Sequence, residues 1–154
     1  MNPSTTNSPR VYVDPQELFS LHVPEGWLVD SSGQQNTRVI LLHPTTEANF
    51  RVNVNVTVQE LRALTPDEFL TMSRLQLKQL TGSPRAERDE PAERRGGGHR
   101  LESTMTLGAV TIETRQLIVL DGGKAYVVTA TAPAGSAANY QREFEVVFES
   151  FQLR

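Results

Sequence analysis

Residues 19–27 have the sequence Phe19-Ser-Leu-His-Val-Pro-Glu-Gly-Trp27, an alternating segment followed by a turn. The apolar residues Phe, Leu and Val fall on one face of a strand and Ser20 and His22 on the other, because side chains alternate along a strand. The Pro-Glu-Gly turn reverses the chain, and Trp27, the only tryptophan, brings a large ring back to the same core. This segment predicts a strand and a turn that anchor the fold.

Periodic segments predict the other elements. Five apolar residues alternate with polar ones over residues 50–58, which indicates a strand with one buried face. Thr65-Pro-Asp-Glu68 predicts the start of a helix, with Thr65 and Glu68 forming a capping box. Ser136 is expected to cap the last helix. The expected strands are about 17–23, 27–30, 38–43, 50–58, 101–107, 110–120 and 125–132, and the expected helices are about 66–80 and 137–148.

Tight turns join most neighbouring strands, among them Asp121-Gly-Gly-Lys124. They indicate an α+β fold with a central, mostly antiparallel sheet of about six to seven strands, covered by the two helices. Residues 1–16 are expected to form a flexible polar tether, with a short extended piece near residues 10–14. Residues 17–154 are expected to form a single domain, with a mobile loop rich in glycine, proline and charge at about 82–100.

Composition excludes several classes of function. The net charge of −3 removes the electrostatic case for general nucleic-acid or anionic-membrane binding. Because the chain has no cysteine, disulfides, thiol nucleophiles and thiolate metal sites are excluded. No apolar run approaches the roughly 20 residues of a membrane span.

No constellation of reactive residues stands out, so we expect no catalytic, cofactor or metal site. His22, His43 and His99 are too far apart in the sequence to supply the short-range pair typical of a metal site. The run Arg94-Arg-Gly-Gly-Gly-His-Arg100 leads into a strand and lacks the lysine of a phosphate-binding loop. Asn53 and Asn55, on the polar face of their strand, are expected to be exposed or paired with neighbours.

The helix expected at 66–80 carries an unusually wide apolar arc. One explanation is a helix packed on the sheet with a loop over its flank, and the other is an exposed strip that receives a partner. The candidate partner-contact residues are those of this arc and of the basic loop: Met72, Leu75, Leu80, Arg94, Arg95 and Arg100.

Several segments together resemble the PsbP and DcrB group of domains, which share a fold with the yeast Mog protein. They are the opening segment 19–27, residues 53–58 leading into 64–69, residues 124–129, and the closing pair of Ser150 and Phe151. The resemblance implies an α/β/α sandwich and a non-catalytic role. Similar proteins include bacterial envelope lipoproteins, an extrinsic photosystem subunit, and EagR-type chaperones of type VI secretion effectors.

Three functional hypotheses follow. The first is a non-catalytic protein-interaction module of the PsbP/DcrB type, bacterial and envelope-associated. The alternative is a cytosolic chaperone of the EagR type that shelters apolar segments of an effector. A small hydrolase or ligand carrier is the third. The expected partner is a protein and not a nucleic acid, with membrane contact only through a lost lipid anchor, and the chain is a monomer or a weak homodimer. The compartment is the cell envelope or the exterior if a signal segment was removed, and otherwise the cytoplasm.

Overall fold

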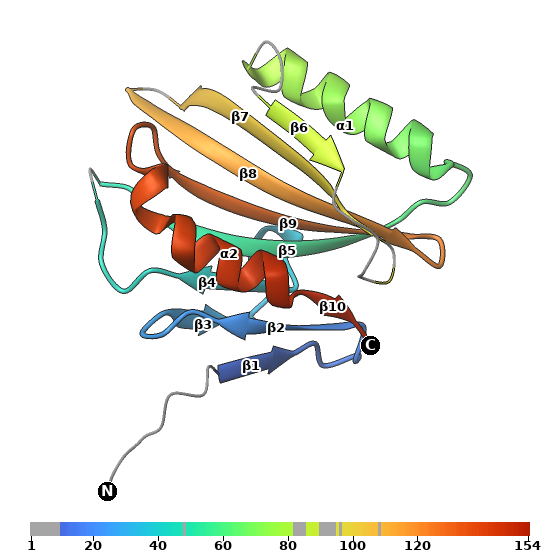
Figure 1. The fold of residues 1–154 in the computed structure, drawn as a ribbon, viewed down its shortest axis with the longest axis horizontal. Helices are drawn as coiled ribbons and strands as arrows, with labels where there is room; N and C mark the ends of the chain where they lie inside the picture. Colours follow the sequence, from blue (N-terminus) through green and yellow to red (C-terminus); the bar gives the residue numbers. More distant parts are fainter. Residues whose placement is uncertain (1–9, 48, 82–85, 90–94, 96, 108) are drawn as a thin grey trace, which may run out of the picture.

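The computed structural model describes residues 10–154 except 48, 82–85, 90–94, 96 and 108, and only the backbone of 76–81, 86–89 and 107. Its elements follow the expected order (Figure 1), but a strand at Ala86–Asp89 pairs with the next strand inside the segment expected to be a mobile loop. The strands are β1 (Arg10–Val13), β2 (Phe19–Val23), β3 (Leu28–Asp30), β4 (Val39–Leu42), β5 (Asn53–Glu60), β6 (Ala86–Asp89), β7 (His99–Leu107), β8 (Val110–Asp121), β9 (Lys124–Pro133) and β10 (Gln152–Leu153). The helices are α1 (Pro66–Thr81) and α2 (Gln141–Ser150), with short 3₁₀ turns η1 (Gln34–Asn36) and η2 (Ala137–Tyr140).

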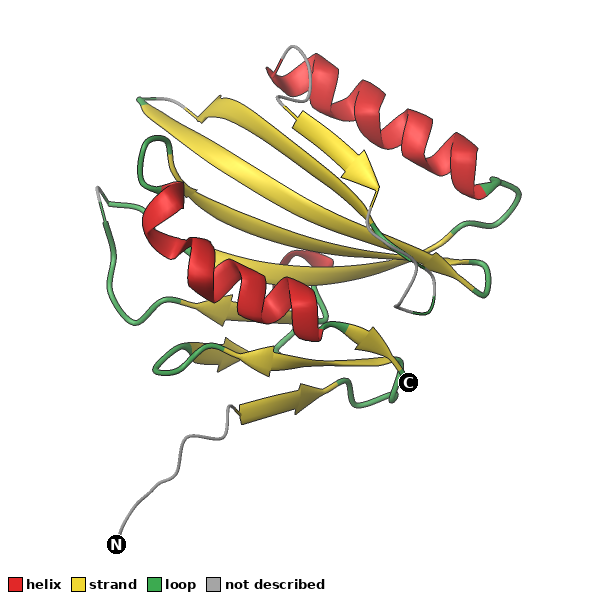
Figure 2. Cartoon of the chain, in the orientation of Figure 1, coloured by secondary structure: helices red, strands yellow, loops and turns green. Residues whose placement is uncertain are grey.

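The larger sheet has seven strands in the order β3-β4-β5-β9-β8-β7-β6. Every neighbouring pair is antiparallel, as the tight turns predict. Its centre is built from the long strands β5, β9 and β8 (Figure 2): a hairpin joins β8 to β9, and β5 pairs with the other edge of β9. Gly122 and Gly123 form the turn of that hairpin with φ angles of 59° and 77°, which glycine adopts at little cost.

A second sheet of three strands, β1-β2-β10, lies beside the first. The expectation of a single sheet is therefore incomplete, because β2 pairs with segments from both ends of the domain and not with β3. The expected tether at 1–16 is too long for the same reason: Arg10–Val13 is a strand in register with Val23–Ser20. Residues 1–9 lie outside the described residues.

The main core lies between the larger sheet, α2 and the second sheet. Phe19 and Phe151 stack at its centre with ring centroids 5.4 Å apart. Trp27 is buried in the same core, as the opening segment predicts. The other large members are Leu21, Val39, Leu41, Val54, Val56, Leu117, Val119, Tyr126, Val128, Phe144, Val147 and Phe148.

A smaller core lies on the opposite face of the larger sheet, under α1. It contains Leu61, Phe69, Leu101, Ile118, Ala125 and Val127. Together the two cores make the α/β/α sandwich that the resemblance implies, with α1 and α2 on opposite faces (Figure 1).

The two helix starts differ in how well the sequence predicts them. The capping box is confirmed, because the Thr65 N–H donates to Glu68 Oε1 (2.9 Å) and the Glu68 N–H donates to Thr65 Oγ1 (3.1 Å). The expected cap at Ser136 is wrong: its side chain makes no capping bond and its hydroxyl donates to Glu47. The expected helix 137–148 is split into the 3₁₀ turn η2 and the helix α2.

Replacing Phe19 by alanine should destabilise the protein by about 3–5 kcal/mol, because the change leaves a cavity in the main core beside Phe151. Val11→Ala is the control, since Val11 is 56% exposed on β1 and should change stability by no more than about 0.5 kcal/mol. The measurement is the free energy of unfolding in urea. Equal losses for the two variants would contradict this account of the core.

Candidate functional site

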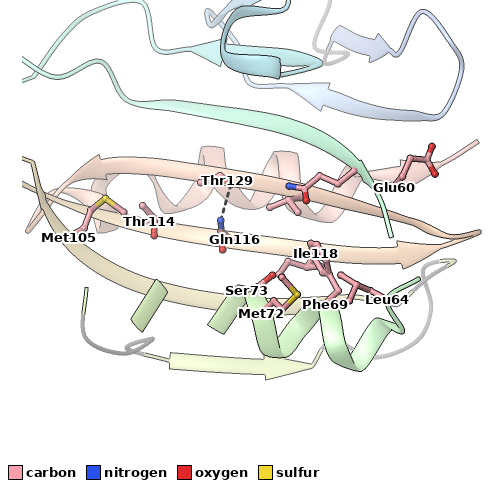
Figure 3. Close-up of a pocket in the computed structure, with 12 residues that line it drawn as sticks. Glu60, Leu64, Phe69, Met72, Ser73, Met105, Thr114, Gln116, Ile118 and Thr129 are labelled. Atoms are coloured by element: carbon pink, nitrogen blue, oxygen red, sulfur yellow. Dashed lines mark hydrogen bonds between the residues drawn. The ribbon is translucent and has the colours of Figure 1, made fainter. Parts of the chain in front are cut away.

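A pocket of about 310 Å³ lies between α1 and the part of the larger sheet beside it that no described element covers (Figure 3). It exists because α1 packs mainly against β7 and leaves the neighbouring strands open beside it. Its lining residues come from α1, the segment before it and four strands: Gln59, Glu60, Leu64, Phe69, Met72, Ser73, Met105, Thr114, Gln116, Ile118, Val127 and Thr129.

One side of the pocket is apolar. Phe69 and Met72 lie three residues apart on α1, so they share a face of the helix and point toward the sheet. Ile118 and Val127 face them from β8 and β9. Met72 remains 46% exposed, so this apolar side continues from the buried core to the surface.

The other side of the pocket is polar and, apart from Glu60, its described residues are uncharged. Gln116 and Thr129 are cross-strand partners, and the Gln116 side-chain amide donates to the Thr129 hydroxyl (3.2 Å), as Figure 3 shows. Thr114 lies two residues from Gln116 on the same face of β8, and its hydroxyl is 2.6 Å from that of Ser103. These bonds hold the polar groups in fixed positions along the sheet.

The uncharged surface extends beyond the pocket toward β5. Asn55 is opposite Thr129, and Asn53 is opposite Thr131. Asn53 donates from its side chain to the Arg51 carbonyl (3.0 Å). Both asparagines are half-buried, which fits the expectation of pairing with neighbours for Asn53.

Two of the six candidate contact residues border this region. Met72 lines the pocket and Leu75, 53% exposed, lies one turn further along α1. The side chain of Leu80 and the whole of Arg94 lie outside the described residues. Arg95 is exposed and reaches away from α1, because its guanidinium donates to the Arg154 carbonyl (3.1 Å) and lies 3.5 Å from Asp121.

Arg100 lies on the opposite face of the sheet and is only 9% exposed. Its guanidinium forms two hydrogen bonds with the Glu145 carboxylate (3.0 and 3.1 Å) and lies 4.6 Å from the centre of the Phe148 ring. Arg100 therefore fastens α2 to β7, and as a buried, paired cation it does not belong to an exposed contact surface.

A polar cluster around Glu47 was missed by sequence reasoning. The Glu47 carboxylate accepts hydrogen bonds from the hydroxyls of Ser136 and Tyr140. The His43 ring lies edge-on between Trp27 and Tyr140, with centroid distances of 5.5 and 5.4 Å. These residues come from three distant segments and join the loop after β4 to the turn η2. No local motif announces such a cluster, because its members are about 90 residues apart.

Hydrogen bonding in this cluster changes two pKa values. The bonds from Ser136 and Tyr140 hold the pKa of Glu47 below its usual value. The same bond to Glu47, together with burial, raises the pKa of Tyr140 to about 12. The carboxylate form of Glu47 is thus the one that holds the two segments together.

The cluster brings together an imidazole, a carboxylate and hydroxyls but not the order of a hydrolytic triad. Ser136 donates directly to Glu47, whereas the His43 Nδ1 atom lies 3.1 Å from the Thr45 amide nitrogen and 3.2 Å from its hydroxyl. A triad needs the imidazole between the hydroxyl and the carboxylate. The hydrogen bonds are therefore a structural contact, the Glu47 latch, which joins the loop after β4 to Ser136 and η2.

Two further features bear on function. Within the part of the chain that the structure describes, no group of three or more His, Cys, Asp or Glu residues is placed to hold a metal ion. Over those same residues, none of the helices has the length and apolar character needed to cross a membrane.

The PsbP family matches residues 8–153. This match covers nearly the whole domain, and the chain belongs to the PsbP family, in agreement with the resemblance found in its sequence. No curated protein matches it.

Several solved structures share the fold at low sequence identity. Cyanobacterial PsbP (CyanoP) from Synechocystis sp. PCC 6803 has a TM-score of 0.71 at 14% identity, covering 96% of this chain and 93% of CyanoP. LpqN, described as involved in cell envelope biogenesis of Mycobacterium tuberculosis, has a TM-score of 0.61 at 13% identity, covering 96% and 86%. The Saccharomyces cerevisiae Ran-binding protein Mog1p has a TM-score of 0.61 at 11% identity, covering 96% of each chain. These similarities show the Mog/PsbP fold alone.

Replacing Glu47 by glutamine should flatten the acid part of the stability profile. A carboxylate with a depressed pKa stabilises the fold above its unfolded pKa of about 4.3, and this contribution is lost as the pH falls through the folded value. The unfolding free energy of the wild type should therefore fall more steeply than that of Glu47→Gln between about pH 5 and pH 3.

The matched control is Glu25→Gln, in the exposed turn after β2, since Glu25 makes no side-chain bond to any residue that the structure describes. Urea unfolding at several pH values measures the difference. Parallel profiles for the wild type and Glu47→Gln would show that the latch contributes nothing to acid stability.

Proposed function

We propose that this protein is a non-catalytic protein-interaction module of the PsbP type, which binds a protein partner through the exposed side of α1. The observation that carries the proposal is the apolar strip formed by Met72 and Leu75, which are 46% and 53% exposed. They lie next to each other on α1, beside the pocket and its apolar side. Large apolar side chains gathered at one exposed place favour a binding surface over an ordinary surface.

The family context supports the same proposal. Mog1p is described as a Ran-binding protein, so this fold is compatible with protein recognition, although fold alone does not assign a function. The described residues offer a structural latch at Glu47 and no triad order there. Together these observations favour binding over catalysis.

A second candidate is a chaperone that shelters an apolar segment of its partner. The observation that favours it is the pair of methionines, Met72 and Met105, at the pocket. Methionine side chains are flexible and polarizable, and they are common on surfaces that accept varied apolar segments. In the first proposal the module acts in the bacterial envelope, and in the second it acts in the cytosol.

A photo-crosslinking amino acid placed at position 75 should capture one discrete protein in the cells that make this chain. The same amino acid at position 11 is the matched control, because Val11 is 56% exposed and Leu75 53% exposed, and β1 is distant from α1 (Figure 1). Adding Met72→Glu should weaken binding of the captured partner about tenfold, since a charge then lies in the apolar contact. The measurement is the yield of the adduct, followed by titration of the purified pair.

Three results would contradict the proposal: no adduct at position 75, the same adduct at both positions, or unchanged affinity in Met72→Glu. Fractionation of the same cells separates the two candidates. An adduct in the envelope fraction supports the first, and a cytosolic adduct whose partner contains apolar segments supports the second.

A further inference from the structure

We propose that the pocket between α1 and the larger sheet binds a short, uncharged amphiphile. Its aliphatic part lies against Met72 and Ile118, and its hydroxyl or amide groups lie on Gln116 and Thr129. This site shares Met72 with the contact strip of Met72 and Leu75. Its occupant is a small molecule and not a protein, and a different experiment tests it.

The division of the pocket into two sides sets the shape of the ligand. The side under the helix is lined by the apolar side chains of Phe69, Met72, Ile118 and Val127. Gln116 and Thr129 bring an amide and a hydroxyl to the strand side, as Figure 3 shows. A ligand that fills the pocket therefore buries an aliphatic chain against the apolar side and places its polar groups against the strand side.

The charges of the pocket lining favour a neutral ligand. Among the described residues that line the pocket, Glu60 alone is charged; it is 61% exposed and lies 3.5 Å from the Lys124 amine. A carboxylate placed on the strand side would lose hydration without meeting an opposite charge, and the Glu60 carboxylate that an ammonium could meet is already paired with Lys124, so burying either charge is costly. Hydroxyl and amide groups lose less, and they find partners there.

The strand side has hydrogen-bonding capacity to offer. The Gln116 amide uses one N–H on Thr129, while its Oε1 atom accepts no hydrogen bond from any residue that the structure describes. The Thr129 hydroxyl accepts the bond from Gln116 and still has its own proton to donate. One acceptor and one donor therefore lie next to each other, which suits a ligand hydroxyl.

The volume of the pocket and the flexibility of its methionines limit the length of the ligand's aliphatic chain. A volume of about 310 Å³ is at the lower end of the roughly 300–1,000 Å³ range of small-molecule sites. Met72 and Met105, the two methionines after Met1, both line the pocket. Their flexible thioethers let it adjust to a short chain.

The same methionines supply the test. Protein carrying an NMR-active carbon isotope in its methionine methyl groups gives one signal per methionine, assigned with Met72→Leu and Met105→Leu. Mono-octanoylglycerol, added below the concentration at which it aggregates, should shift the Met72 and Met105 signals saturably. Octanoate and octylammonium have a chain of the same length with a charge, and each should bind at least about tenfold more weakly.

Two variants test the polar contacts. Gln116→Leu should weaken binding of mono-octanoylglycerol about tenfold, because the ligand hydroxyl loses its partner. Gln152→Leu, the same change on exposed β10 away from the pocket, should leave the affinity unchanged. Leu75→Glu should also leave it unchanged, since Leu75 is in the protein-contact strip but does not line the pocket. Thermal unfolding checks that each variant is folded.

The absence of saturable shifts would overturn the proposal. Equal affinities for the three compounds would do so as well, because they would mean an apolar cavity that ignores the head group. If Gln116→Leu bound as tightly as the wild type, the assignment of the polar side would be wrong. A loss of binding only in Leu75→Glu would show that the pocket belongs to the protein-contact strip.

Discussion

The structure depends on the two-residue alternation of its central strands, which bury both of their faces. On β8, Leu117 and Val119 enter the main core while Ile118 enters the smaller core under α1. A shift of one residue in the pairing of β8 with β9 would exchange the two sets. It would also take Gln116 and Thr129 away from the pocket. Both cores and the candidate site therefore rest on one register.

The candidate surface arises because α1 is smaller than the sheet face on which it packs. The helix closes the apolar part of that face, around Ile118 and Leu101, and leaves the part with hydroxyls and amides open beside it. The opposite face is closed by α2 and the second sheet, with Arg100 and Glu145 fastening the helix. In this chain, one face of the sheet is thus covered, and among the described residues the other face is partly open beside α1.

The sequence predicts those features that depend on neighbours along the chain. The alternation of residues 19–23, the capping box at Thr65 and the hairpin at Gly122 are all local, and the structure contains each of them. The second sheet and the pocket depend on contacts between remote segments, which no periodicity encodes. Ser136 shows the difference: its sequence context favours a helix cap, but a carboxylate 89 residues away takes its hydroxyl instead.

The second sheet also determines when the fold can be completed. Its middle strand β2 is synthesised early, yet the Ser150 hydroxyl that accepts its His22 N–H lies 128 residues later, and Phe19 finds Phe151 at a similar separation. Contacts between segments this remote form slowly, because the entropy of closing a long loop is lost before the contacts contribute any stabilising free energy. Until the end of synthesis, the apolar strand β2 therefore lacks its partner β10 and the Phe151 side chain. Exposed apolar surface of this kind is what general chaperones protect.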